Sequence, residues 1–522
     1  MQHLRKIRWL TLVLIMAVVT ACGGGNAQNQ QSDSSTGAGS DTPDNTVDAP
    51  EPSGERPTVE FVVNNGPAKY PGGMDENNNP YIEYIREGSN VDLRLITPPS
   101  EGYQDRLNVI MASGDLPDMI HTKDEAFFIN YVNQKAFQSL NDAIDKYGAN
   151  LKRLIPEEAW ENVTIDGQIY AVPALAKIRA GEMMFARKDW LDKVGLEPPK
   201  TLDEYTRVIQ AFAEEDPDGN GKNDTFGLIL EEKLFKTQPF FGAFGVQRGQ
   251  WYDRDGELVY SGILPEMKQA LEYLAGLFAN GWIDPEWPLN KNANSNEKIA
   301  NGKVGLYAAL WHETRGAMLT NKNNDPNAEW IRLEYPVGPE GKSGGKGPET
   351  VAGYNVVPVS SNKADIVIQV LDFLIQEEHY KTLNFGFEGE VYEIVDGEMV
   401  TNFDEHNKHI YRQTLHQLVE PPYGEVLKTR HDSLGKEFNL VDNVEFGHRN
   451  LIESDFLGTA TPAMGKYLTN LTKLEEEYFT KIIMGTIPVD DFDKFVAEWK
   501  RTGGDEIAKE VNEWYRMSKA SK

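Results

Sequence analysis

One run of the chain, Asp216–Gly227, combines the residue types and the spacing of a calcium-binding loop. Its oxygen-bearing side chains stand at positions 1, 3, 5 and 9, which are Asp216, Asp218, Asn220 and Asp224. In such loops position 7 contributes a backbone carbonyl and a glycine at position 6 allows a sharp bend, roles that fall to Lys222 and Gly221. Ca²⁺ is a hard cation that takes about 6–8 oxygen ligands. The pattern therefore predicts one structural calcium site.

The loop differs from an EF-hand at position 12, where Gly227 replaces the bidentate glutamate. Further ligands would have to come from Thr225, from a distant carboxylate or from water. A polar turn without metal is the alternative, because Asp, Asn and Gly are also the residues that favour tight turns.

A predicted helix leads directly into this loop. It opens with a capping box, Thr201-Leu202-Asp203-Glu204. Apolar residues then share one stripe of the helix, and they are Leu202, Tyr205, Val208, Ile209 and Phe212. We expect the loop to tie the Phe212 end of the helix to residues 226–228, so that calcium acts first on stability and only indirectly on ligand affinity.

The length and charge of the chain limit its classes of partner. Its 522 residues exceed the size at which a single core stops growing, so two or more lobes are expected. The formal charge of −29 argues against binding nucleic acid and against adsorption to an anionic membrane through the protein surface. Such acidity suits a solvated extracellular protein, although it can equally serve solubility alone.

The N-terminal residues resemble a bacterial lipoprotein signal. Basic residues precede an apolar run, Trp9–Val19, that is too short to span a membrane. The run ends in Val19-Thr20-Ala21-Cys22-Gly23, which is similar to a lipobox, and Cys22 is the only cysteine. We expect a signal peptide over 1–21, and a diacylated Cys22 with a disordered tether over 22–57.

Hydrophobic patterns predict an α/β fold made of two units. In the first, strands are expected at 58–63, 91–96 and 116–120, with helices at about 81–87 and 103–112 between them. This alternation predicts a largely parallel sheet. The pattern restarts near residue 180, with a strand at 182–186 and helices at 189–194 and about 267–278. Further elements are expected as strands at 304–310 and 351–359, a helix at 363–376, and a helical C-terminal region from residue 466.

Eight short stretches follow one another in a characteristic order. They are residues 107–118, 166–173, 187–191, 200–205, 216–227, 281–286 (Gly-Trp-Ile-Asp-Pro-Glu), 301–305 (Asn-Gly-Lys-Val-Gly) and 512–515. Together with the lipobox, they resemble the family 1 extracellular solute-binding proteins of bacterial ABC importers, in particular the long lipoprotein branch of Gram-positive bacteria. The resemblance covers residues from about 57 to the end of the chain.

This resemblance implies a two-lobed, periplasmic-binding-protein-like fold of type II, similar to maltose-binding protein, with a cleft between the lobes. The N-terminal lobe would comprise 58–180 plus 350–385, and the C-terminal lobe 181–349 plus 386–522. The expected partners are an oligosaccharide and the transmembrane subunits of an ABC permease. We expect a monomer that binds no nucleic acid and meets the membrane only through its lipid anchor, at the extracellular face of the cytoplasmic membrane of a Gram-positive bacterium.

Family position also implies which residues contact the sugar. Sugar sites combine aromatic faces with planar polar groups where two lobes meet. The candidates are Asn64, Tyr70, His121, Asp124, Phe241, Trp251, Trp311, His312, Arg315 and Tyr354. The structural alternative for each aromatic is ordinary core packing, and a lone histidine such as His121 can equally be a core or surface residue.

The nature of the sugar stays open. Arg179, Arg187 and Arg315 could pair bidentately with uronate carboxylates, as a pectin-type or alginate-type ligand would require. They could as well pair with the many Asp and Glu side chains of the protein itself.

A binding protein without enzymatic activity is the favoured function. A secreted polysaccharide-active enzyme, such as a glycosidase or lyase, would need a carboxylate pair or an equivalent base and metal. The 81 acidic residues always supply candidate pairs, so their presence does not discriminate. A peptide-binding or structural surface lipoprotein is the third possibility.

Overall fold

The computed structural model describes residues 56–66 and 69–520. The chain divides into two units, residues 1–55 and 56–522, and only the second is described below. The predicted signal peptide over 1–21, the lipidation site Cys22 and the tether as far as residue 55 lie outside the described residues. In the part that is described, no helix is long and apolar enough to cross a membrane.

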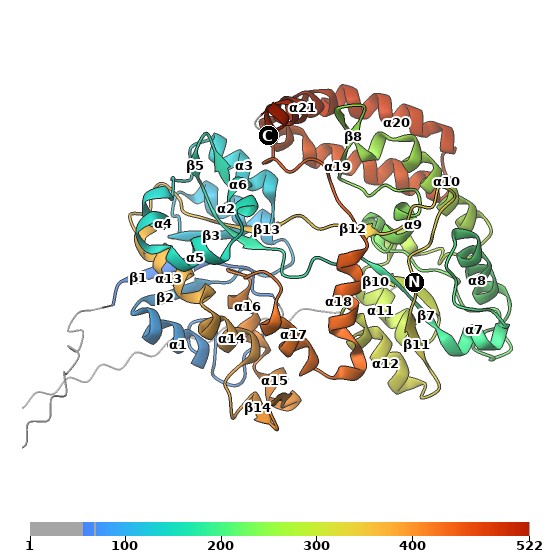
Figure 1. The fold of residues 1–522 in the computed structure, drawn as a ribbon, viewed down its shortest axis with the longest axis horizontal. Helices are drawn as coiled ribbons and strands as arrows, with labels where there is room; N and C mark the ends of the chain where they lie inside the picture. The colour runs from blue at the N-terminus through green and yellow to red at the C-terminus, as the bar shows by residue number, and fades with distance from the viewer. Residues whose placement is uncertain (1–55, 67–68, 521–522) are drawn as a thin grey trace, which may run out of the picture. The chain divides into compact units, whose positions relative to one another are not determined.

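The first lobe is built on a five-stranded sheet in the order β2-β1-β3-β13-β6 (Figure 1). Its strands are β1 Thr58–Val62, β2 Asp92–Ile96, β3 Met119–Thr122, β6 Val172–Leu175 and β13 Val351–Val356. Strand β1 is parallel to β2 and β3, whereas β13 is antiparallel to both β3 and β6. The expected largely parallel sheet is confirmed, because β1, β2, β3 and β6 run in one direction and within this sheet only β13 is antiparallel to them. The chain enters β13 from the second lobe, so this strand runs in the direction opposite to its neighbours.

Helices of the first lobe pack around this sheet. They are α1 Pro80–Ser89, α2 Tyr103–Ser113, α3 Glu125–Asn133, α4 Asn141–Tyr147, α5 Ala149–Leu154, α6 Glu157–Glu161, α13 Ala364–Ile375 and α14 Glu377–Phe385, with a small hairpin of β4 Thr164–Ile165 and β5 Gln168–Ile169. Asn79 caps α1, because its side chain accepts hydrogen bonds from the backbone N–H groups of Tyr81 and Ile82 at 3.1 Å each. The buried Asp372 of α13 similarly accepts from the N–H groups of Asn150 and Leu151, which fixes α5 against α13.

The second lobe contains a three-stranded antiparallel sheet in the order β10-β7-β11. Its elements are β7 Met183–Arg187, α7 Lys188–Val194, α8 Leu202–Glu214, α9 Gln238–Gly242, the hairpin β8 Trp251–Arg254 and β9 Glu257–Tyr260, α10 Pro265–Ala279, α11 Asn292–Ala300, β10 Leu306–Ala309, α12 Ala317–Asn324 and β11 Trp330–Arg332. The predicted capping box is confirmed: the Glu204 N–H donates to Thr201 Oγ1 at 3.3 Å, and the Thr201 N–H donates to Glu204 Oε2 at 2.9 Å.

Three segments connect the two sheets. Residues 176–182 lead from β6 to β7, and residues 347–350 lead from β12 Gly345–Lys346 to β13. Strand β12 pairs in parallel with β16 Leu451–Ile452, so the returning chain lies beside this connection. The third connection, around residues 419–440, precedes α18 Leu440–Arg449. Repeated crossings of this kind are the structural basis for a hinge.

Residues 386–420 contact the first lobe. They include β14 Tyr392–Val395, β15 Glu398–Thr401, α15 Phe403–Lys408 and α16 Gln413–His416, and α17 Glu425–Asp432 follows. Gln417 Nε2 donates to the carbonyl of Asn64 at 2.8 Å, and Thr414 Oγ1 donates to the carbonyl of Asn65 at 3.0 Å. The expected boundaries assigned these residues to the second lobe; from the contacts, we propose to assign 386–420 to the first.

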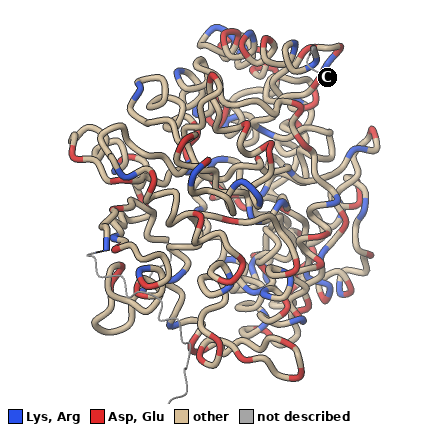
Figure 2. Tube along the Cα trace, turned by 60° about the vertical axis from the view of Figure 1, so that its left-hand side comes forward, with Lys and Arg blue, Asp and Glu red and all other residues tan. Residues whose placement is uncertain are grey.

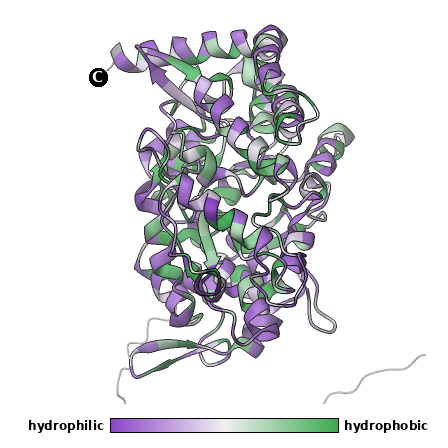
Figure 3. Ribbon diagram, turned by 90° about the vertical axis from the view of Figure 1, so that its right-hand side faces the viewer, coloured by the Kyte–Doolittle hydropathy of each residue, from purple (hydrophilic) through white to green (hydrophobic). Residues whose placement is uncertain are grey.

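The C-terminal region is helical, as expected. It consists of α19 Pro462–Ile483, α20 Phe492–Trp499 and α21 Asp505–Ala520. Its buried side chains are Phe479, Ile482, Phe492, Phe495, Trp499, Ile507 and Val511. Hydrophilic and hydrophobic segments alternate along these helices (Figure 3), as expected for helices with one face on a core. Helix α19 packs on both α3 of the first lobe and α10 of the second.

Candidate functional site

A cavity of about 620 Å³ is lined by residues from both lobes, and we call it the interlobe cavity. The first lobe contributes Glu125 and Glu158, and the second contributes Phe241 and Trp251. The connecting segments contribute Arg179 and Lys346, and α19 contributes Met464, Leu468 and Glu475. A ligand held there would touch both lobes and the segments between them.

Two of the predicted sugar contacts, Phe241 and Trp251, line the interlobe cavity. Phe241 is buried in the short helix α9, and Trp251 begins the β8–β9 hairpin. The Trp251 ring lies 5.4 Å from that of Tyr260, and the Tyr260 ring stacks on Trp499 at 4.8 Å, centroid to centroid. Trp251 is therefore one edge of an aromatic cluster that extends into the C-terminal helices.

The cavity carries charges of both signs, and acidic and basic residues are interspersed along the described chain (Figure 2). Burial, and then the nearby Glu349, raise the pKa of Glu125 to about 8, although the N–H of Ala460 donates to its carboxylate at 3.1 Å. Burial lowers the pKa of Lys346. Arg179 pairs with Glu453. The sequence singled out neither Glu125 nor Lys346, and a titratable group with a perturbed pKa beside a cavity is typical of functional sites.

Three further predicted contacts, Trp311, His312 and Arg315, lie together after strand β10, and none of them lines the interlobe cavity. The Trp311 ring lies 5.1 Å from His312 and 4.4 Å from His431 of α17, centroid to centroid. The Tyr423 hydroxyl lies 3.2 Å from His431 Nδ1. The Arg315 guanidinium lies over the rings of Phe403 and Phe438 at 5.4 and 5.6 Å. Among the described residues, no hydrogen-bond partner contacts Arg315 Nε.

A buried basic group lies beside these residues. Arg412 donates to the backbone carbonyls of Asn384 and His409. Arg430 donates to Thr401 Oγ1 at 2.9 Å and lies 2.7 Å from His406 Nδ1. Burial, with the positive charges of Arg412 and Arg315, lowers the pKa of Arg430 to about 9. Sequence reasoning missed this group, because short polar helices carry little periodic signal.

Asn64 and Tyr70 follow β1 in the chain and contact residues of the segment 411–417. Ser100 Oγ donates to Asn64 Oδ1 at 2.6 Å, and the Tyr70 ring lies 5.1 Å from that of Tyr411. Burial raises the pKa of Tyr70 to about 12. Asn64 and Tyr70 therefore belong to the first lobe. Neither of them lines the interlobe cavity, which Phe241 and Trp251 do line.

His121 and Tyr354 are core residues of the first sheet. His121 is 1% exposed, and its Nδ1 lies 2.9 Å from Asn355 Oδ1. Asn355 Nδ2 donates to the carbonyls of Val172 and Leu418, so Oδ1 is the acceptor and His121 Nδ1 carries the proton. Tyr354 stacks on Phe128 at 4.6 Å. Their binding roles stay predictions, and neither side chain lines the interlobe cavity.

Asp124 has a local structural role. Its carboxylate accepts the N–H of Phe127 at 3.0 Å and so caps α3. The next residue, Glu125, is the one that lines the interlobe cavity.

The predicted calcium ligands converge in the loop that follows α8. Asn220 Nδ2 lies 2.7 Å from Asp218 Oδ2 and 2.9 Å from Asp224 Oδ1, while the N–H of Gly221 donates to Asp216 Oδ2 at 3.0 Å. The positive φ of Gly221, 75°, is the bend expected at position 6. This oxygen-rich set fits the ligand chemistry of Ca²⁺. Lys303 also pairs with Asp224 at 2.6 Å.

The loop also holds the end of its helix, as its expected role requires. Thr225 is buried, and its hydroxyl donates to the Phe212 carbonyl at 2.7 Å. The N–H of Phe226 donates to the carbonyl of Lys303 at 2.9 Å. None of the loop residues lines the interlobe cavity.

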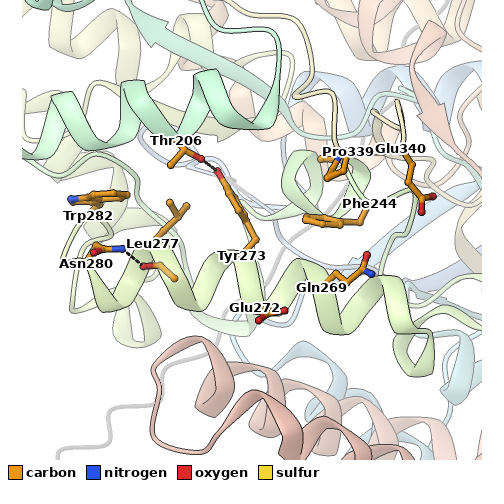
Figure 4. A pocket seen from close by; sticks show the side chains of 12 residues that line it. Thr206, Phe244, Gln269, Glu272, Tyr273, Leu277, Asn280, Trp282, Pro339 and Glu340 are labelled. Atoms are coloured by element: carbon orange, nitrogen blue, oxygen red, sulfur yellow. Dashed lines mark hydrogen bonds between the residues drawn. The ribbon is translucent and has the colours of Figure 1, made fainter.

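A separate pocket of about 660 Å³ lies entirely within the second lobe (Figure 4). Tyr273 of α10 and Thr206 of α8 face each other there, with their hydroxyls 2.9 Å apart, and Trp282 lies at one end. Because its lining comes from one lobe only, a ligand in this pocket would not bridge the lobes.

Residues 81–383 match the family model described as bacterial extracellular solute-binding protein, which is more than half of the chain. The chain belongs to the bacterial extracellular solute-binding protein family. The recognition made from the eight stretches is thereby confirmed. The description of the family names extracellular solute binding.

This solute-binding protein resembles two proteins of Bacillus subtilis (strain 168) over nearly its whole length. It is 26% identical to lipoprotein LipO over 552 aligned residues, which cover 99% of both chains. It is also 26% identical to the polygalacturonan/rhamnogalacturonan-binding protein YtcQ over 530 residues, covering 97% of this chain and 99% of YtcQ.

A solved structure supports the two-lobed fold. The S. pneumoniae ABC-transporter substrate-binding protein FusA, as an EF-hand mutant in complex with fructo-nystose, superimposes with a TM-score of 0.71 at 20% identity. The superposition covers 89% of this chain and 100% of FusA.

Proposed function

We propose that this solute-binding protein captures an oligosaccharide between its lobes and delivers it to the permease of an ABC importer. The interlobe cavity is the observation that carries the proposal, since its lining comes from both lobes and from the segments that connect them. A ligand that contacts both lobes favours the closed conformation by its higher affinity for that form. The relatives YtcQ, a polygalacturonan/rhamnogalacturonan-binding protein, and FusA, solved with fructo-nystose, agree with a carbohydrate ligand.

The proposed mechanism has no catalytic step. Hinge closure, around the segments 176–182 and 347–350, would present a changed surface to the permease. The protein would act as a monomer, because one chain already supplies both walls of the cavity.

The protein would be held at the extracellular face of the cytoplasmic membrane by a lipid on Cys22. The lipobox-like sequence supports this, as does the similarity to lipoprotein LipO. Replacing Cys22 by Ser should release the protein into the culture medium. A Cys22→Ser protein that stays with the membrane fraction would overturn the anchoring proposal.

We further propose an acidic sugar that reaches beyond the interlobe cavity to a group of basic residues outside its lining. Burial, and then the positive charges of Lys177, Arg430 and Arg315, lower the pKa of His431 to about 3. Such a concentration of cations in a chain of charge −29 could attract uronate carboxylates. Polygalacturonan, for which YtcQ is named, is of this class.

A matched pair of sugars tests the acidic class. Oligogalacturonate and its methyl ester have the same length and rings but differ in charge. Arg315→Gln should weaken binding of the acid by roughly tenfold, or about 1.4 kcal/mol, and leave the ester unaffected. Arg254→Gln is the control, because Arg254 lies at the end of β8 and pairs with Glu266 of α10. Equal affinity of the wild type for both sugars would contradict an acidic ligand.

Calcium would occupy the Asp216–Gly227 loop as a structural ion. The converging carboxylates support this, as does the FusA structure, which is that of an EF-hand mutant. The ion would stabilise the junction between α8 and the strand-like segment after it.

The ligand itself can be found by a thermal-shift screen in the presence of calcium. Any ligand that binds only the folded state raises its melting temperature. Oligomers of pectin, alginate, xylan and mannan cover the acidic and neutral classes. A shift with one of them supports the proposal, and no shift with any of them at saturating concentration would contradict carbohydrate binding.

A further inference from the structure

Three side chains outside the interlobe cavity and outside the calcium loop bring potential metal ligands together. They are Glu390, Glu405 and His409, and one ligand atom from each lies within 4.8 Å of the others. His409 Nε2 lies 3.4 Å from Glu390 Oε1 and 4.0 Å from Glu405 Oε2. Among the described residues this is the one such group of three.

We propose that Glu390, Glu405 and His409 bind a divalent transition-metal ion of the zinc type. Zn²⁺ takes imidazole nitrogen and carboxylate oxygen at about 2.0–2.2 Å, which places neighbouring ligand atoms of a tetrahedron roughly 3.3–3.6 Å apart. The 3.4 Å between His409 Nε2 and Glu390 Oε1 falls within this spacing, and the 4.0 Å to Glu405 Oε2 is longer, so the Glu405 side chain would move slightly inward on binding an ion.

The local structure presents the two helical ligands on one side. Glu405 lies in α15 and His409 caps its C-terminal end, so the two are one helical turn apart. Glu390 comes from the loop before β14, and it follows Phe387, whose carbonyl accepts the N–H of Glu390 at 3.3 Å. The site would therefore join this loop to α15.

His409 is oriented by a partner on its other nitrogen. Its Nδ1 lies 2.9 Å from the hydroxyl of Tyr81, which is fully buried. If Nδ1–H donates to that hydroxyl, Nε2 is left without a proton and directed at the two carboxylates. Metal-bound histidines commonly have such a hydrogen bond on the second ring nitrogen.

The neighbouring cations leave the proposed ligand atoms accessible. Lys408 pairs with the other carboxylate oxygen of Glu405, Oε1, at 2.6 Å, and Arg412 donates to the backbone carbonyl of His409 at 2.8 Å. Glu390 is about half exposed, with 51% of its side chain accessible, so an ion can enter and a water can fill the fourth position.

The choice of metal follows from the nitrogen ligand. Imidazole suits zinc and similar transition metals, whereas Ca²⁺ and Mg²⁺ prefer oxygen-only sites. The His409 ring also lies 5.8 Å from that of Tyr411, which contacts the predicted sugar contact Tyr70. A bound ion would hold the His409 ring in place and thereby support the packing of Tyr411 and Tyr70.

Titration of the purified, untagged protein with Zn²⁺ in excess Ca²⁺ tests the site, because Ca²⁺ occupies the oxygen-only loop. The wild type should bind one equivalent of Zn²⁺, and Co²⁺ in its place should give the strong visible absorption of a four-coordinate ion. Glu390→Gln should weaken Zn²⁺ binding by at least roughly tenfold. Because the Glu390 side chain is half exposed, this substitution should not disturb the fold.

Glu393→Gln is the matched control, since Glu393 is an exposed glutamate three residues along the same segment. It should bind Zn²⁺ like the wild type. No stoichiometric Zn²⁺ binding by the wild type, or equal affinity in the wild type and Glu390→Gln, would overturn the proposal. Neither measurement involves sugar, so the result is independent of the proposed transport function.

Discussion

The indole ring of Trp311 lies 4.4 Å from the imidazole of His431, centroid to centroid, at an interplanar angle of 35°. Trp311 follows strand β10 of the second lobe, and His431 belongs to α17, which packs on α14 and α18. One face of the indole is thus already covered in this conformation. A sugar ring stacking on Trp311 would use its other face or displace His431.

Replacing Trp311 by Ala should weaken sugar affinity by at least roughly tenfold, or about 1.4 kcal/mol, while the fold is kept. Loss of the contact with His431 should also lower the free energy of unfolding by about 1 kcal/mol. Calorimetric titration with the sugar found by thermal shift, and urea unfolding of the free protein, measure the two effects separately.

Trp282→Ala provides the comparison for this variant. Trp282 is also half-buried, but it lines the pocket within the second lobe and donates its indole N–H to Glu214 at 2.8 Å. It should leave sugar affinity unchanged. If Trp311→Ala binds sugar as the wild type does, Trp311 is not part of the site.

Removing calcium should lower the melting temperature and affect sugar affinity only indirectly. Without the ion, the carboxylates of Asp216, Asp218 and Asp224 repel one another at the end of α8. Asp218→Asn should reduce the dependence of melting temperature on calcium. Differential scanning calorimetry with Ca²⁺ and with chelator measures it.

Asp255→Asn, in the turn between β8 and β9, is the control for the calcium loop. This variant should keep the full calcium effect. Equal melting temperatures of the wild type with Ca²⁺ and with chelator would mean that Asp216–Gly227 is a turn without metal.

Stability should fall as the pH is lowered, in part because of His121. Burial lowers its pKa from 6.5 to about 4, and Nε2 has no hydrogen-bond partner among the described residues. The unfolded chain takes up a proton below its ordinary pKa, whereas the folded protein stays neutral until about pH 4. The contribution is therefore complete above pH 6.5 and is lost down to about pH 4, on the order of 3 kcal/mol in all.

Urea unfolding of the wild type and of His121→Gln at about pH 7 and about pH 5 measures this effect. The variant has lower stability at neutral pH but should lose less of it on acidification. Burial also lowers the pKa values of His406 and His431 to about 3. Both proteins should therefore still lose some stability on acidification. Identical slopes would show that His121 contributes nothing to the acid sensitivity.

Sugar binding should close the two lobes. Small-angle X-ray scattering with and without saturating sugar should show a smaller radius of gyration in the complex, because the bound ligand favours the closed form. A non-binding sugar of equal length is the control. An unchanged radius at saturation would argue against hinge closure.

The sequence allowed much of the fold to be predicted where local signals are strong. The capping box at Thr201 and the amphipathic stripe behind it are local features, and helix α8 begins where they predict. The orientation of β13 was not accessible in this way. Its direction depends on the chain returning from the second lobe, about 180 residues after β6 began.

The candidate site was harder to predict. Phe241 and Trp251 were found by family position, but Glu125 and Lys346 line the same cavity without any motif. Arg412 and Arg430 resemble surface residues in the sequence, and only the packing of residues 386–449 buries them. Burial of a charged side chain is a long-range property, which spacing along a short helix does not encode.

Binding of an intact oligosaccharide tests the central claim most directly. Titration calorimetry with oligogalacturonate in calcium, followed by chromatography of the recovered sugar, reports both affinity and chemical change. We predict one saturable site per chain and sugar recovered at its original length. Shortened or unsaturated sugar would indicate an enzyme, and absence of saturable binding to the pectin, alginate, xylan and mannan oligomers alike would contradict an oligosaccharide receptor.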